Sequence, residues 1–205
     1  MKRTKIALLI IVIVIAGCSL INPIYPHEQL LQQAGTVLLL AVMVVDIFRG
    51  RFSLLAYGCI ALFTIVHIIG ARYIYSYVPY QEWFSTINLD LNSLFGTTKR
   101  NGYDRFVHFA FGFVMLPVLY ELVEHKLKRP LVSLLMAWLM IQFGSLIYEL
   151  FEWSLTIFLS PTDANNYNGQ QGDMWDAQKD MALALLGSTI TSLFYTFYIK
   201  IKRNK

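Results

Sequence analysis

Residues 131–158 read LVSLLMAWLMIQFGSLIYELFEWSLTIF. The stretch is apolar along most of its length, and it is longer than the about 20 residues that a helix needs to cross a bilayer. Near its end it nevertheless carries two acids, Glu149 and Glu152. A membrane helix keeps such acids away from lipid, because an exposed charge in the bilayer is costly. The stretch therefore predicts a membrane helix whose acids face other helices.

The rest of the chain has the same character. Of its 205 residues, 56% are hydrophobic and only 15% are charged, which is less charge than a soluble domain of this size carries. The expected spans are residues 6–22, 29–48, 52–71, 104–124, 131–158 and 177–199. We therefore predict an all-α polytopic membrane protein, with six transmembrane helices in one bundle and a single integral membrane domain over residues 1–205.

Basic residues lie on one side of this arrangement. They precede the first span, follow the last and occupy alternate connections: Lys2, Arg3, Lys5, Arg49, Arg51, Lys126, Lys128, Arg129, Lys200, Lys202, Arg203 and Lys205. The positive-inside rule then places both termini in the cytoplasm and residues 23–28, 72–103 and 159–176 outside. The net charge of +4 has this topological explanation, so it gives no reason to expect nucleic-acid binding.

The two cysteines, Cys18 and Cys59, both fall within expected spans, which makes a disulfide framework unexpected. The stretch VIAGCS ending at Ser19 follows a basic start and an apolar run, as in a bacterial lipoprotein signal. Cleavage there would leave a lipidated Cys18 and five spans. The alternative is that the first span stays in the membrane as an uncleaved helix.

Acids and histidines gather at the outer ends of four expected spans. They are His67, Asp104, His108, Glu149, Glu152, Asp173, Asp176 and Asp180. Asp104 and His108 are four residues apart, so they lie about 40° apart on one helical face. Asp173, Asp176 and Asp180 also share a face, because residues i, i+3 and i+7 lie on one side of a helix. We expect these residues to line one cavity open to the outside.

Simpler roles exist for single members of this group. Asp173 or Asp176 suits the N-cap of the last span, and either histidine suits a buried hydrogen bond to a carbonyl. Other residues have expected structural roles. Gln142 fits a contact between helices, and Asp46 fits a pair with Arg49. An aromatic belt at the outer interface is expected from Trp83, Trp153, Trp175, Tyr73, Tyr75, Tyr77, Tyr80 and Tyr103.

So many carboxylates in a small volume need neutralising, and Arg105 and Lys179 are the fixed cations expected nearby. Carboxylates together with imidazoles are a common ligand set for divalent transition metals. We therefore expect a divalent metal ion as the cofactor if there is one. Its candidate ligands are His67, His108, Glu149, Glu152, Asp173 and Asp176. The candidate catalytic residues are Asp104, His108, Glu149, Glu152, Asp176 and Asp180.

Four motifs at these positions resemble a known family: HIIGARYIYSYVP, NGYDRFVHFAFGF, YELFEW and QGDMWDAQKDM. Over residues 30–200 the chain is similar to the YjdF family of uncharacterised bacterial inner-membrane proteins. The resemblance implies a six-helix inner-membrane protein and no particular activity. The family's motif positions are His67, Tyr73, Tyr75, Asp104, His108, Glu149, Glu152, Gln171, Asp173, Asp176, Gln178 and Asp180.

A shorter pattern resembles VanZ-like membrane proteins, which are linked to glycopeptide-antibiotic resistance. It comprises Asp104, His108, Glu149 and the segment from Asp176 to Gly187. This pattern implies a fold rather than an activity.

Three functions remain open. The first is metal-dependent chemistry on, or binding of, a lipid or envelope precursor, although no nucleophile or zinc-protease motif is present. The second is a small ion- or proton-coupled transporter, since intramembrane acids mark ion paths. The third is a non-catalytic envelope factor. Membrane lipids are the expected partners, and association between copies of the chain is left open. A polar path from Gln142 on to Glu121 would favour transport, whereas a closed outer bowl would favour chemistry or binding.

Overall fold

The computed structural model describes residues 1–84, 100–160, 164, 167–168 and 171–203. The helices there are α1 (Lys2–Ser19), α2 (Pro26–Arg49), α3 (Leu54–Arg72), the short α4 (Tyr80–Phe84), α6 (Tyr103–Leu127), α7 (Pro130–Phe158) and α9 (Asp176–Arg203). No strand occurs in this part of the chain, which confirms the all-α prediction. Much of the predicted outer segment 72–103 lies outside the described residues.

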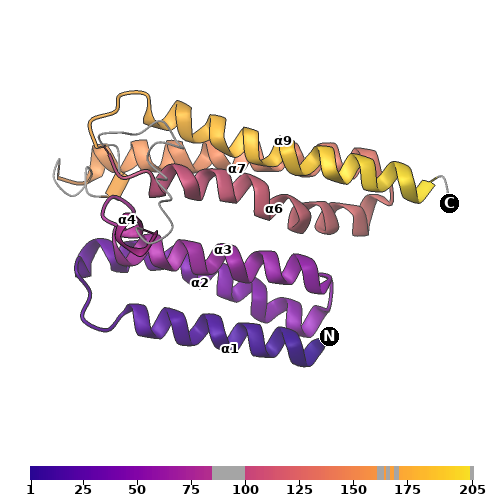
Figure 1. The fold of residues 1–205 in the computed structure, drawn as a ribbon, viewed down its shortest axis with the longest axis horizontal. Helices are drawn as coiled ribbons and strands as arrows, with labels where there is room; N and C mark the ends of the chain where they lie inside the picture. Colours follow the sequence, from indigo (N-terminus) through magenta and orange to yellow (C-terminus); the bar gives the residue numbers. More distant parts are fainter. Residues whose placement is uncertain (85–99, 161–163, 165–166, 169–170, 204–205) are drawn as a thin grey trace.

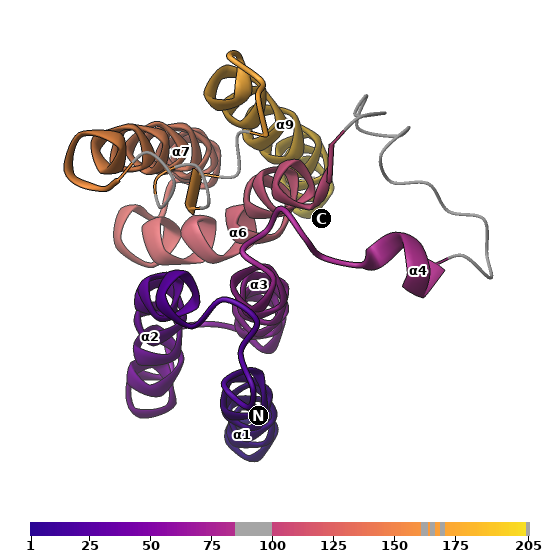
Figure 2. The ribbon, with the colours of Figure 1, turned by 90° about the vertical axis from the view of Figure 1, so that its left-hand side faces the viewer.

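The long helices form two layers of three (Figure 1). Helices α1, α2 and α3 pack together in one layer, and α6, α7 and α9 pack together in the other. The layers meet chiefly where α3 packs against α6, as the end-on view in Figure 2 shows. The described amino-terminal and carboxy-terminal residues lie at the same end of the bundle. We call the opposite end, where α6 and α9 begin, the site end.

Five helices are long and apolar enough to cross a membrane: α2, α3, α6, α7 and α9. The prediction of six spans is therefore supported for five. Helix α1 has only 18 residues, and Lys2, Arg3 and Lys5 are among them, so its uncharged part is shorter than the about 20 residues that a span needs. The expected first span, residues 6–22, also extends past the helix, which ends at Ser19.

At the end of the bundle where both chain termini lie, local sequence explains where the helices begin and end. Gly50 ends α2 in the left-handed conformation with φ 60°, which glycine adopts without steric cost. The Ser53 side chain caps α3 by accepting the backbone N–H of Ala56. Pro130 begins α7 directly after a two-residue connection, because proline suits the first turn of a helix. These short connections make α2 antiparallel to α3 and α6 antiparallel to α7.

Helix α1 is tied to its layer by buried polar contacts. The Lys5 ammonium donates to the Asp46 carboxylate at 2.6 Å and to the Phe52 carbonyl at 2.6 Å. At the other end of α1, the Arg72 guanidinium donates to the Ser19 carbonyl at 2.5 Å. The expected pairing of Asp46 with Arg49 is therefore wrong. The carboxylate is turned toward Lys5, which neutralises it inside the protein.

Helices α6 and α9 run in the same direction and touch through their backbones. A Cβ added at Gly112 would lie 2.0 Å from the Ala184 carbonyl oxygen, and one added at Gly187 would lie 2.3 Å from the Phe109 carbonyl oxygen. Small residues allow such close approach in membrane helices. The Thr191 hydroxyl also donates to the Phe113 carbonyl at 2.9 Å. This contact fixes the register of the two helices, and the register sets the site.

Helix α7 is joined to α9 by side-chain hydrogen bonds in mid-span. The Gln142 amide donates to the Ser188 hydroxyl at 2.9 Å, and the Trp138 indole donates to the Thr189 hydroxyl at 3.1 Å. The expected role of Gln142 as a contact between helices is confirmed.

Candidate functional site

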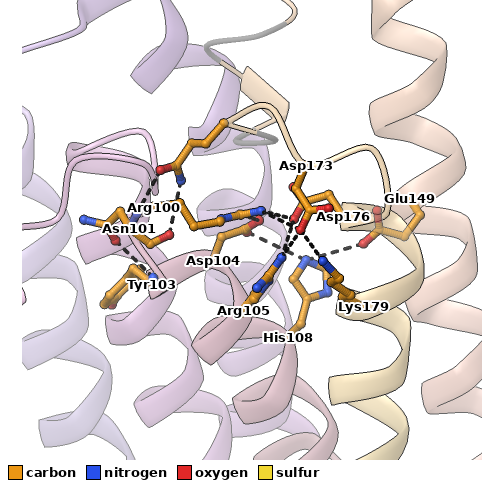
Figure 3. Close-up of polar contacts among 12 residues, drawn as sticks. Arg100, Asn101, Tyr103, Asp104, Arg105, His108, Glu149, Asp173, Asp176 and Lys179 are labelled. Carbon is orange, nitrogen blue, oxygen red and sulfur yellow. Dashed lines mark hydrogen bonds and ion pairs between the residues drawn. The ribbon is translucent and has the colours of Figure 1, made fainter. Parts of the chain in front are cut away.

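A network of charged side chains lies at the site end, between the starts of α6 and α9 (Figure 3). Arg100 forms an ion pair with Asp176, and Arg105 forms one with Asp173. Arg100 also lies 3.9 Å from Asp104. The side chains of both arginines are buried. Buried ion pairs of this kind are costly to break, since removing one partner leaves an uncompensated charge.

Arg100 is the member of this network that was not predicted from the sequence. It precedes α6 in a long connection, where no helical periodicity assigns it to a face. The sequence feature that indicates a contact with Asp104 is the position of Arg100, four residues before Asp104 in RNGYD. The neighbouring Asn101 and Gln171 strengthen the same junction, because the Asn101 backbone N–H donates to the Gln171 amide oxygen at 2.8 Å.

Asp173 joins three cationic or polar donors just before α9. The Lys179 ammonium donates to its carboxylate at 2.6 Å, and Arg105 contacts the same oxygen. Its other oxygen accepts the Trp175 backbone N–H at 3.1 Å. The Lys179 hydrogen bond, together with those from Trp175 and Arg105, lowers the pKa of Asp173 to about 2. The expected N-cap role of Asp173 is therefore not confirmed. Asp173 stabilises the turn that precedes α9, and the helix begins at Asp176.

One turn deeper, Asp104, His108 and Asp180 come together. Each offers a ligand atom, and these atoms all lie within 4.8 Å of one another. All three residues are buried, and Asp180 is only 2% exposed. The Oδ1 atom of Asp180 has no hydrogen-bond partner among the described residues. The three residues thus form a buried, partly unsatisfied group with the composition of a metal site. We call it the Asp–His–Asp group.

Glu149 and Glu152 of α7 both face protein, as expected. Glu149 lies with Oε1 3.5 Å from His108 Nε2, so it borders the Asp–His–Asp group. The Glu152 carboxylate is hydrogen-bonded by Tyr148, whose hydroxyl also contacts Tyr167. Burial raises the pKa of Tyr167 to about 12, so the Tyr167 hydroxyl keeps its proton at neutral pH.

His67 lies outside the Asp–His–Asp group. Its Nε2 is 3.1 Å from the Gln32 carbonyl, and its Nδ1 is 2.5 Å from the Tyr75 hydroxyl. A carbonyl only accepts, so Nε2 carries the proton and Tyr75 donates to Nδ1. Both nitrogens are therefore engaged. Of the candidate metal ligands, the structure brings His108 into the Asp–His–Asp group and leaves out His67, Glu149, Glu152, Asp173 and Asp176.

His67 nevertheless lines a cavity of about 230 Å³ between the two layers together with Asp104 and His108 of the Asp–His–Asp group. Helices α2, α3, α6 and α7 all contribute residues to its lining. Its polar lining residues include Asp104, His108 and Tyr148, and its apolar ones include Leu39 and Phe111. The prediction of one common cavity is therefore only partly correct. His67, Asp104 and His108 line this cavity, whereas the other five expected residues do not: Glu149, Glu152, Asp173, Asp176 and Asp180.

The aromatic belt is only partly as expected. Trp153 and Trp175 are exposed, in agreement with a role at the interface. Tyr75, Tyr80 and Tyr103 are instead buried and packed together beside α3 and α6. Their hydroxyls have internal partners; Tyr103, for example, donates to the Val66 carbonyl at 2.8 Å. These tyrosines therefore shape the protein interior at the site end.

The fold and the site define a multi-pass α-helical membrane protein with a buried acid and histidine cluster at one end of its bundle. The chain belongs to the family described as predicted membrane protein (DUF2238), which matches residues 4–201. It is 28% identical over 178 residues to inner membrane protein YjdF of Escherichia coli (strain K12), a match that covers 82% of this chain and 78% of the relative. No solved structure matches the chain.

These matches confirm the resemblance to the YjdF family and support a multi-pass inner-membrane protein. They do not show the resemblance to VanZ-like proteins. Neither description states an activity.

Proposed function

We propose that the Asp–His–Asp group binds a divalent metal ion, and that the bound ion serves chemistry on the polar group of a membrane lipid or envelope precursor. The observation that carries this proposal is Asp180. It is 2% exposed, one carboxylate oxygen lacks a hydrogen-bond partner among the described residues, and the ligand atoms of Asp104 and His108 lie within 4.8 Å. A buried carboxylate in that position needs a proton or a cation.

The distribution of charge supports a cation there. Arg100, Arg105 and Lys179 form ion pairs with Asp104, Asp173 and Asp176. Within the described residues, no lysine or arginine forms an ion pair with Asp180, Glu149 or Glu152. A divalent ion at the Asp–His–Asp group would neutralise part of this remaining charge. One imidazole with two carboxylates suits a transition metal such as Zn²⁺ or Mn²⁺.

The chemistry would follow from the neighbours of the ion. A protein-bound divalent metal lowers the pKa of a bound water toward neutrality and polarises phosphoryl or carbonyl oxygens. Glu149, 3.5 Å from His108, is placed to accept a proton from such a water. Hydrolysis or group transfer on a lipid head group is the reaction class that these residues fit.

We infer that the site end faces the outside of the inner membrane. The basic residues that flank the spans, including Arg51, Lys128 and Arg129, belong to the connections at the opposite end. The positive-inside rule assigns that end, with both termini, to the cytoplasm. Substrate would then reach the site from the outer leaflet or the periplasm.

Transport is less well supported. A transport path would continue from Gln142 toward Glu121, but Gln142 is hydrogen-bonded to Ser188. Below it, Leu134, Ala137 and Ile141 of α7 pack with Leu116 and Ala184 in an apolar cluster. This apolar cluster separates the site end from Glu121. Binding or chemistry is therefore favoured over transport.

Metal analysis of the full chain tests the proposal. Protein purified in detergent, stripped with a chelator and reloaded with Zn²⁺ or Mn²⁺, should hold about one ion per chain. Asp180→Asn should lose that ion, whereas Glu152→Gln, which removes a buried acid outside the Asp–His–Asp group, should retain it. Absence of metal from folded wild-type protein, or equal metal in Asp180→Asn, would show that the proposal is wrong. Metal without turnover of any lipid would favour the non-catalytic alternative.

A further inference from the structure

The cavity between the layers has two chemically different parts. Asp104 and His108 bring charged or polar groups to it, and most of the remainder is apolar, with Leu39, Phe63 and Phe111 among the lining residues. His67, Tyr75, Ser145 and Tyr148 also line it. Its volume of about 230 Å³ is below the roughly 300–1,000 Å³ of pockets that enclose whole small molecules. A cavity of this size and lining holds part of an amphipathic molecule and leaves the rest outside.

The cavity reaches the lipid-facing surface through α2. Leu38 lines it and is also 67% exposed. Leu38 lies midway along α2, which runs from Pro26 to Arg49 and is long enough to span the bilayer. The exposed side of the cavity wall therefore lies at the depth of the hydrocarbon layer.

Helices α2 and α7 form the two sides of this opening. They lie on the same side of the bundle in the end-on view, with α6 between them (Figure 2). Gly35 of α2 and Gly144 of α7 both line the cavity, and neither has a side chain that would fill it. A Cβ at Gly144 would lie 3.2 Å from the Phe111 ring, so a larger side chain there would enter the cavity.

The geometry points to a lateral lipid site: one hydrocarbon chain of a membrane lipid enters between α2 and α7 and places its polar group at Asp104 and His108. This inference rests on the proposed function, and it specifies that the substrate is a lipid that enters from the bilayer. A hydrocarbon chain fits because the walls are apolar and the opening faces lipid, where transfer of a chain from bilayer to cavity leaves it in apolar surroundings.

Photolabelling inside the bilayer tests the lateral site. The full chain is reconstituted in vesicles of phosphatidylethanolamine and phosphatidylglycerol that contain a phosphatidylethanolamine with a diazirine on one acyl chain, within the first few carbons from the head group. On irradiation the diazirine loses N₂, and the carbene inserts into a nearby C–H bond. Two buried residues that line the cavity, Val107 and Ser145, should then carry the adduct.

Matched buried residues on the same helices give the control. Val118 of α6 is 4% exposed against 7% for Val107, and Ser133 of α7 is 0% exposed against 2% for Ser145, but neither control residue lines the cavity. Labelling of Val107 and Ser145 well above Val118 and Ser133 supports the inference. Equal labelling within both pairs overturns it.

A blocking variant gives a second measurement. Gly144→Leu should lower labelling of Val107 several-fold, whereas Gly58→Leu, where an added Cβ meets nothing within 4 Å, should not. Unchanged labelling in Gly144→Leu would contradict entry between α2 and α7. Metal content is measured on the same samples. Bound metal without cavity labelling refutes the lateral site alone, whereas labelling without metal refutes the metal proposal and leaves the lipid site standing.

Discussion

Gly112 of α6 and Gly187 of α9 each face the backbone of the other helix. Side chains at these positions would overlap the Ala184 and Phe109 carbonyl oxygens. Because α6 and α9 run in the same direction, this contact sets which turns lie side by side. It places Asp104 near Arg100 and Asp176, and His108 near Asp180. The site therefore depends on two glycines that carry no functional group.

Alanine at either glycine should destabilise the protein. Gly112→Ala and Gly187→Ala insert a methyl group where a backbone already lies, and overpacking of this kind costs about 1–3 kcal/mol. Thermal unfolding in detergent should show a lower Tm for both variants. Gly58→Ala, with open space around it, should keep or raise the Tm, because alanine favours a helix over glycine. A Tm as high as wild type in Gly112→Ala would contradict the close packing.

Removing Arg100 should be far more damaging than removing Lys179. The side chains of Arg100 and its partner Asp176 are both buried, and breaking a buried pair costs about 3–5 kcal/mol. The Lys179 side chain is 48% exposed, so Lys179→Ala should cost about 1 kcal/mol or less. Stability in detergent, measured for Arg100→Ala with and without Asp176→Asn, provides the check. The double variant should recover part of the loss, and strict additivity would speak against the pairing.

Stability should fall in acid partly through Asp173. The hydrogen bond from Lys179 lowers the pKa of Asp173 from 3.8 to about 2 in the folded protein. A lowered folded-state pKa means that the carboxylate stabilises the protein above its ordinary pKa, and that this stabilisation is lost as pH falls toward 2. Asp173→Asn should therefore be less stable than wild type at neutral pH, with the difference shrinking between about pH 4 and pH 2. A constant difference across that range would show that the ion pairs do not contribute.

Helix α1 should depend on the buried Lys5. Lys5→Ala leaves the buried Asp46 carboxylate without its cation, so we expect a loss of about 3–5 kcal/mol and easier proteolysis near the amino terminus. Lys2→Ala, at an exposed position of the same helix, is the control and should be neutral. A neutral Lys5→Ala would mean that α1 is held mainly by its apolar contacts.

The orientation of the bundle can be tested with reporters. A reporter fused after Lys205 should be active in the cytoplasm, and one inserted after Ser160 should be active outside. The reverse result would place the site end in the cytoplasm and remove the outer leaflet as a source of substrate. A mass spectrum of the intact chain distinguishes the uncleaved helix, which retains Met1, from processing at Cys18.

The sequence alone determined most of the membrane helices and which acids and histidines they carry. Apolar length is a local property, so residues 131–158 predict a membrane helix without knowledge of any partner. Helical spacing is equally local, and it assigned Asp104 and His108 to one face and Asp176 and Asp180 to another. The contact of Gln142 with another helix was also predicted correctly, because a polar residue in the middle of a span has few other ways to satisfy its hydrogen bonds.

The tertiary structure decided which faces meet. The pairing of Asp46 with Lys5 rather than Arg49 joins residues 41 positions apart, and no periodicity relates them. The inclusion of Arg100 depends on how a connection returns to the start of α6, and the exclusion of His67 depends on Tyr75 folding back onto it. The local sequence determines which side chains lie on each face of a helix. The close packing of α6 and α9 at Gly112 and Gly187 determines which of those side chains share a site.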